Sequence, residues 1–209
     1  MERIIYILIL IILEHDFYQD ISTIYSPTSY DFLVNKNNKL TSDYIPNDLE
    51  NISLEYSCEN KQLRYEAKNA FEKMAKRAKE DGYNIIAVST YRSYEYQEKL
   101  YNNYVKDKGK YYADLASARA GHSEHQTGLA VDVANTSLDY DNFEQTKEFN
   151  WMINNSYKYG FILRYPKAKF HITGFKYEPW HYRYVGIDIA TYIYENNITL
   201  EEYNKNNTR

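Results

Sequence analysis

Residues Gly121–Val133, GHSEHQTGLAVDV, join a cluster of ionisable side chains to an apolar segment that reads as a buried strand. In GLAVDV, alternate side chains point to opposite faces, so Ala130 and Asp132 share one face and the leucine and valines take the other. Asp132 therefore projects from a strand whose back is buried, where a carboxylate needs a partner such as a cation. His125 lies just ahead, and Gly128 allows a bend that brings its imidazole and the Asp132 carboxylate to one point.

A third metal ligand can come from YEPWHYRYVG, residues 177–186, where Glu178 and His181 stand three residues apart. Two histidines and an aspartate with one open position form a catalytic zinc site, and a nearby glutamate outside the ligand set is the base that such a site requires. The alternative is that the histidines are surface or hydrogen-bonded core residues, which spacing alone does not exclude. We expect His122 and His171 to be solvent-exposed or to lie behind the ligands.

Composition limits the classes of partner and of metal site. The chain has 209 residues, the length of one large domain, and a formal net charge of -4 with a pI near 5.8. This acidic balance gives no basic footprint, which argues against nucleic acid as a partner. A single cysteine excludes an intrachain disulfide and a cysteine-rich cluster, so any metal must be held by His, Asp or Glu.

Hydrophobic periodicity predicts interspersed helices and strands. Apolar spacing predicts a helix over 62–81, a capping serine opens another at 93–105, and a capping box (Thr199, Glu202) opens the last one. Strands are predicted at 84–90, 127–133, 161–166 and 177–186, and another helix at 146–159. This order predicts an α+β fold: a single compact domain with a small central, mainly antiparallel sheet flanked by helices.

The N-terminus carries an apolar run, residues 4–13, that is too short to span a bilayer. It has the length of a signal-peptide core, yet its β-branched content fits a buried strand equally well. We therefore predict that residues 1–32 form a leader or an apolar strand with a polar connection, and that residues 33–209 form the functional domain.

Four motifs occur in one order along the chain: STYRSYEYQEKLY, SARAGHSEHQTGLAVDV, KYGFILRYP and TGFKYEPWHYRYVG. With them, residues 33–194 resemble the VanY-type D-alanyl-D-alanine carboxypeptidases, a zinc peptidase family that also includes LdcB-type L,D-carboxypeptidases. The resemblance implies a compact α+β domain of the hedgehog/DD-peptidase type. It also implies that His125, Asp132 and His181 hold Zn²⁺ and that Glu178 is the catalytic base.

The resemblance implies further roles in catalysis and in substrate binding. Arg92 is expected to stabilise the oxyanion or to bind substrate, and Gln97 and Ser123 match substrate-contacting positions. The chain departs from the family where Ala120 stands in place of a common proline and where His122 is a histidine. Neither departure touches the implied ligand set.

The predicted activity is removal of the C-terminal D-alanine from peptidoglycan stem peptides, with the D-Ala-D-Ala pentapeptide as first choice. The alternatives are an L,D-carboxypeptidase acting on tetrapeptide stems, a peptidoglycan endopeptidase, and a non-catalytic zinc-containing module that binds the cell wall. Glu178 argues against the last of these, because a binding module has no need of a base. We expect a monomer on the wall side of a bacterial membrane, associated with the wall or the membrane.

Overall fold

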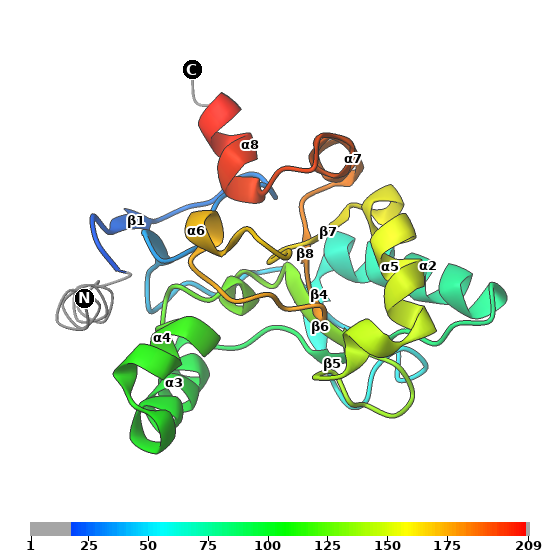
Figure 1. The fold of residues 1–209 in the computed structure, drawn as a ribbon, viewed down its shortest axis with the longest axis horizontal. Helices are drawn as coiled ribbons and strands as arrows, with labels where there is room; N and C mark the ends of the chain where they lie inside the picture. Colours follow the sequence, from blue (N-terminus) through cyan, green and yellow to red (C-terminus); the bar gives the residue numbers. More distant parts are fainter. Residues whose placement is uncertain (1–17, 208–209) are drawn as a thin grey trace, which may run out of the picture.

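A four-stranded sheet occupies the centre of the molecule, and helices surround it (Figure 1). The computed structural model describes residues 18–207, so the apolar run at residues 4–13 lies outside the described part. The strand order is β5-β6-β8-β7, and every neighbouring pair is antiparallel. These strands are β5 Ile86–Ser89, β6 Ala130–Ala134, β8 His181–Tyr184 and β7 Phe161–Leu163. The predicted α+β class with a small, mainly antiparallel sheet is confirmed.

The remaining elements form two short strand pairs and a shell of helices. β1 Ser22–Ile24 pairs in parallel with β2 Asn38–Leu40, and β3 Leu49–Asn51 pairs antiparallel with β4 Gln62–Arg64. The α-helices are α2 Tyr65–Glu80, α3 Tyr94–Lys108, α4 Lys110–Ala116, α5 Lys147–Asn155, α6 Phe170–Thr173, α7 Ile187–Asn196 and α8 Leu200–Asn207. Short 3₁₀ helices are η1 Glu124–Thr127, η2 Phe143–Gln145 and η3 Ser156–Tyr159.

The two faces of the central sheet differ in chemistry. On one face, Val131 and Val133 of β6 and Tyr182 of β8 pack into the main core with α2 and α5, which lie together in Figure 1. Because side chains alternate along a strand, the opposite face carries Asp132 and His181. The β6–β8 register places these two residues directly opposite each other. Burial of one face therefore determines which polar groups meet on the other.

The predicted helix over 62–81 begins later in the structure. Residues 62–64 form β4, with Arg64 in an extended conformation (φ −59°, ψ 147°) and its amide bonded to the Gly128 carbonyl. The prediction was wrong here because Leu63 fits both the helical spacing and the alternation of a strand. Pairing with β3 decides the conformation, and the helix starts at Tyr65.

The predicted helix caps are present. The Ser93 hydroxyl accepts a hydrogen bond from the Tyr96 amide at the start of α3. At α8, the Thr199 amide donates to the Glu202 carboxylate, and the Glu202 amide donates back to the Thr199 hydroxyl. This reciprocal pair is the predicted capping box, and it fixes where α8 leaves the body of the protein.

The segment before residue 33 contacts the rest of the protein. β1 lies in this segment and pairs with β2, which follows the predicted boundary. The Tyr18 ring packs edge-on against His122, with ring centroids 4.8 Å apart. Within residues 18–207, none of the helices has the length and apolar character needed to cross a membrane.

Two glycines with positive φ provide a test of the packing behind the sheet. At Gly160 (φ +83°), an added Cβ lies 2.7 Å from the Tyr184 ring and 3.0 Å from the Gly186 backbone. At Gly82 (φ +90°), no heavy atom of the described chain lies within 4 Å of the added Cβ. We expect Gly82→Ala to lower the free energy of unfolding by about 1–2 kcal/mol through backbone strain alone. Gly160→Ala should lower the free energy of unfolding by about 1–3 kcal/mol more than Gly82→Ala does, because of the steric clash.

Denaturant unfolding of the metal-free protein measures both glycine variants. Equal losses of stability in the two would contradict the close packing of Gly160 against β8.

Candidate metal and active site

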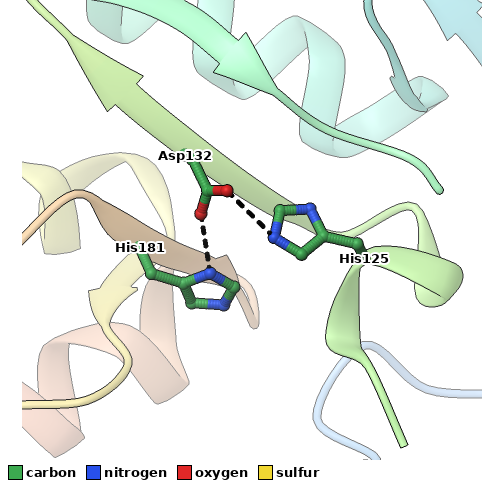
Figure 2. A group of neighbouring side chains, drawn as sticks. All are labelled: His125, Asp132 and His181. Atoms are coloured by element: carbon green, nitrogen blue, oxygen red, sulfur yellow. Dashed lines mark hydrogen bonds and ion pairs between the residues drawn. The ribbon is translucent and has the colours of Figure 1, made fainter. Parts of the chain in front are cut away.

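His125, Asp132 and His181 converge on one point at the open face of the sheet (Figure 2). One ligand atom from each residue lies within 4.8 Å of the others, and all three residues are buried. Asp132 comes from β6, His181 comes from the facing position of β8, and His125 comes from η1 just before β6. The structure thus brings together the three residues predicted as metal ligands.

Hydrogen bonds behind the two histidines determine which ring nitrogen faces the centre. His125 Nδ1 lies 2.6 Å from the Thr90 carbonyl oxygen, which can only accept, so Nδ1 carries the hydrogen and Nε2 faces Asp132 Oδ2 at 3.2 Å. His181 Nε2 lies 3.4 Å from Glu124 Oε2, and its Nδ1 lies 2.8 Å from Asp132 Oδ1. Each imidazole therefore turns one nitrogen toward the carboxylate and anchors the other, as metal-binding histidines do.

Local charge gives the two histidines opposite protonation preferences. Burial, reinforced by the Arg92 guanidinium, lowers the pKa of His125 to about 4. Burial also disfavours a charge on His181, but hydrogen bonds to Asp132 and Glu124 outweigh it and raise the pKa of His181 to about 9. The metal-free centre thus holds one positive charge beside Asp132. A divalent cation supplies that charge in place of the ring proton, so the donor set fits a metal.

Glu178 lies in the same cleft without being part of the ligand cluster. A turn places it: the Glu178 amide donates to the Tyr165 carbonyl, and the His181 amide donates to the Glu178 carbonyl. Burial raises the pKa of Glu178 to about 7. Within the described chain, its carboxylate accepts no hydrogen bond. A buried carboxyl group with a pKa near neutrality can accept and return a proton, as a general base does.

Arg92 and Gln97 form a connected pair beside the cluster. The Arg92 side chain is 18% exposed and donates to Asp132 Oδ2 (3.0 Å), Gln97 Oε1 (2.9 Å) and Ser89 Oγ (3.1 Å). Gln97 is buried, and its amide nitrogen donates to Ser117 Oγ and to the Ala118 carbonyl. Gln97 also lines the cleft, so its predicted contact with substrate stays a prediction, while its amide oxygen holds Arg92 in place.

A cleft of about 540 Å³ opens over the cluster. Ser123 lines it, and its hydroxyl makes no hydrogen bond to another described residue, so it can bind a ligand. Aromatic residues form much of the remaining wall: Tyr96, Tyr104, Tyr112, Tyr140, Tyr165, Phe175 and Trp180. The cleft thus combines a polar floor with an apolar rim, which suits a peptide.

The other two described histidines lie away from the cluster. His122 is buried, its Nδ1 lies 2.8 Å from the Asn35 carbonyl, and Tyr18 covers its ring. Its predicted position, exposed or behind a ligand, is wrong because the N-terminal segment folds over it. His171 is exposed on α6, one of the two positions predicted for it.

Sequence reasoning missed the charged residues behind His181. Glu124 is fully buried between Arg164 and Arg183, whose charges hold the pKa of its carboxyl well below the usual range although burial opposes this. The Tyr165 ring stacks on His181, with centroids 5.0 Å apart. Arg183 lies two residues beyond His181 on the same face of β8, a spacing that could have indicated its proximity.

Comparison with known proteins finds similarity to carboxypeptidases. Residues 60–187 match the family model described as VanY, D-alanyl-D-alanine carboxypeptidase. YodJ of Bacillus subtilis, a putative carboxypeptidase, is 45% identical over 204 residues, which cover 91% of this chain and 75% of that protein. A D-alanyl-D-alanine carboxypeptidase of Enterococcus faecalis is 36% identical, over 82% of this chain and 64% of that protein. The chain thus spans less than two thirds of the enterococcal relative.

Solved structures share the fold, including the following two. The LdcB LD-carboxypeptidase matches with a TM-score of 0.81 and 43% identity, covering 90% of this chain and 91% of that chain. A variant of the D,D-pentapeptidase VanY from a VanB-type vancomycin-resistance cassette, in complex with Zn(II), matches with a TM-score of 0.72 and 34% identity. That match covers 83% of this chain and 98% of the other.

The geometry of the cluster predicts which substitutions abolish metal binding. We expect His125→Ala, Asp132→Ala and His181→Ala each to lose a bound divalent metal ion, because three protein ligands are needed to hold it. His122→Ala should retain the metal, since its ring contacts Asn35. Metal content measured by mass spectrometry after dialysis distinguishes these results, with circular dichroism to confirm folding. Metal loss in a folded His122→Ala variant, or its retention in His125→Ala, contradicts the assignment.

Proposed function

The chain belongs to the VanY family of D-alanyl-D-alanine carboxypeptidases, and from this we propose that it is a zinc-dependent enzyme that removes the C-terminal D-alanine from peptidoglycan stem peptides. Zinc is proposed because the His–Asp–His cluster has the ligand types and number of a catalytic zinc site, and because a related VanY structure holds Zn(II). We also propose that the protein acts on the wall side of the membrane, where such a substrate lies. Its monomeric state stays a prediction.

The observation that carries the proposal is the position of Glu178. Its carboxyl group is buried in the same cleft as the cluster, has a pKa near 7, and is committed to no other described side chain. A structural carboxylate in a protein interior is normally paired or hydrogen-bonded. A module that only binds the cell wall has no use for an unpaired buried acid, so the arrangement favours turnover.

The reaction divides between the proposed metal and the protein. His125, Asp132 and His181 would hold the zinc ion, which when bound would supply Lewis-acid chemistry, lowering the pKa of a water molecule and polarising the scissile carbonyl. Glu178 accepts the proton of the attacking water and later delivers it to the amine of the departing D-alanine. Arg92 contacts Asp132 and lines the cleft. Its positively charged guanidinium stabilises the negative charge that develops on the carbonyl oxygen.

Recognition of a chain end requires groups that pair with a carboxylate. The Ser123 hydroxyl and the Arg92 guanidinium both lie on the cleft, and Gln97 holds the guanidinium in place. We propose that Ser123 and Arg92 contact the substrate and that Gln97 acts through Arg92. A site built in this way disfavours an amidated end, because its polar groups are then left unpaired.

The second candidate is an L,D-carboxypeptidase acting on tetrapeptide stems. The family model and the enterococcal relative favour the pentapeptide that ends in D-Ala-D-Ala. The LdcB LD-carboxypeptidase, however, matches with a higher TM-score and a higher identity than the VanY structure does. Both reactions release one D-alanine and use the same metal and base, so they differ only in the residue that precedes the cut.

Replacement of the base tests the catalytic assignment. We expect Glu178→Gln to retain zinc and to bind substrate, but to lower kcat by about two to four orders of magnitude, because an amide cannot accept the proton of the water. Steady-state kinetics with the zinc content measured in parallel checks this. A variant with a near-normal kcat would transfer the role to another residue and remove the main support for the proposal.

The bond that is cut can be identified with four purified stem peptides. The zinc-loaded protein is incubated with the pentapeptide and the tetrapeptide, each as a free acid and as a C-terminal amide, and products are identified by mass spectrometry. We expect loss of one D-alanine from the free acids and at least about tenfold slower cleavage of the amides. The faster free acid identifies the D,D or the L,D activity. Equal cleavage of acid and amide, or release of larger fragments, indicates an endopeptidase.

A further inference from the structure

A buried chain of charged side chains connects His181 to the C-terminal helix. Glu124 Oε2 faces His181 Nε2, and Glu124 Oε1 accepts from Arg164 Nε at 2.8 Å. Arg164 then makes a two-pronged pair with Glu201 of α8, with Nη1 to Oε2 at 2.9 Å and Nη2 to Oε1 at 2.7 Å. The side chains of Arg164 and Glu124 are 0% exposed, and that of Glu201 is 12% exposed. This series of charged side chains thus runs from the metal cluster to the partly exposed Glu201 on α8.

Arg183 completes the environment of Glu124 from β8. Its Nη1 donates to Glu124 Oε1 at 2.8 Å, and its Nη2 donates to the carbonyl groups of Tyr30 and Phe32. One oxygen of Glu124 is therefore held by two guanidinium groups, and this orients the other oxygen toward His181. The carboxylate has no freedom to turn away, because both arginines are anchored elsewhere.

Simple stabilisation does not account for this arrangement. Two carboxylates and two guanidinium groups are removed from water here, and replacing such buried ion groups with apolar residues is often neutral or stabilising. A protein that required only a packed core behind β8 would be served by apolar side chains. These charged side chains instead provide orientation, because they hold the Glu124 carboxylate so that it faces His181 Nε2.

We propose that Glu124 is a positioning residue for the metal centre, and that Glu201 on α8 helps to aim it through Arg164. By accepting the hydrogen of His181 Nε2, Glu124 leaves Nδ1 free to face Asp132 and the metal. The inference rests on the proposed zinc site. The proposal extends the metal site to α8, none of whose described residues lines the cleft.

Two isosteric substitutions and one matched control test the proposal. Glu124→Gln keeps the shape but offers an amide in place of the second oxygen, so it cannot serve both arginines and His181. Glu201→Gln weakens the aiming of Arg164 from the partly exposed end. Glu202→Gln is the control: it is the next residue of the same helix, pairs with Lys169 at 3.1 Å, and retains an oxygen to accept from the Thr199 amide.

The measurements are zinc affinity, by competition with a chromogenic chelator, and the visible spectrum of the cobalt(II)-substituted protein, both made on folded samples. We expect zinc binding to weaken by about 10–100-fold in Glu124→Gln, and by up to about tenfold in Glu201→Gln, with a changed cobalt spectrum. Glu202→Gln should match the parent in both. Loss of stability alone lowers the unfolding temperature without altering the cobalt spectrum.

The outcomes separate this inference from the proposed function. If the parent protein binds zinc and releases D-alanine but folded Glu124→Gln keeps the parent's zinc affinity and cobalt spectrum, the positioning role is wrong and the proposed function stands. If Glu124→Gln does not fold, Glu201→Gln decides: values equal to those of Glu202→Gln overturn the proposal, and weaker zinc binding than in that control supports it. A parent protein that binds no zinc overturns both.

Discussion

The pairing of Asp132 with His181 across β6 and β8 is the contact on which the site depends. The two residues oppose each other in the antiparallel register, so the hydrogen bonds of the sheet set the distance between carboxylate and imidazole. A slip of either strand by one residue would turn its own polar side chain, Asp132 or His181, into the core and would expose the apolar side chains of that strand that now pack there. The apolar face therefore protects the geometry of the polar face, since the core accepts only one register.

The rest of the site is arranged around that pair by elements with different constraints. η1 brings His125 to the start of β6, and the left-handed Gly128 makes the short turn possible, since a Cβ there would meet Leu49 at 2.9 Å. Arg92 approaches from the start of α3, where the Ser93 cap fixes the helix end. Each ligand and each neighbouring charge is thus positioned by backbone geometry before any metal binds.

Much of this was predictable from the sequence, and the remainder was not for identifiable reasons. Alternation in GLAVDV predicted that Asp132 points away from the core, and family motifs predicted that His181 joins it. By contrast, Arg164 and Glu124 are forty residues apart, and neither has a local pattern that marks a buried ion pair. The direction of Gln97 depends on Ser117 and Ala118, which only the folding of α4 against α3 brings near.

Ser123, the N-cap of η1, and the next two residues face three different environments. Ser123 faces the cleft, Glu124 faces the buried arginines, and His125 faces the metal cluster. A shift of this backbone to suit another ligand would disturb all three at once, which makes the segment resistant to evolutionary change. Divergence in substrate preference is therefore easier at Tyr104 and Tyr112, which line the cleft from α3 and α4 and are not part of the metal cluster. New specificities in this fold should arise there first.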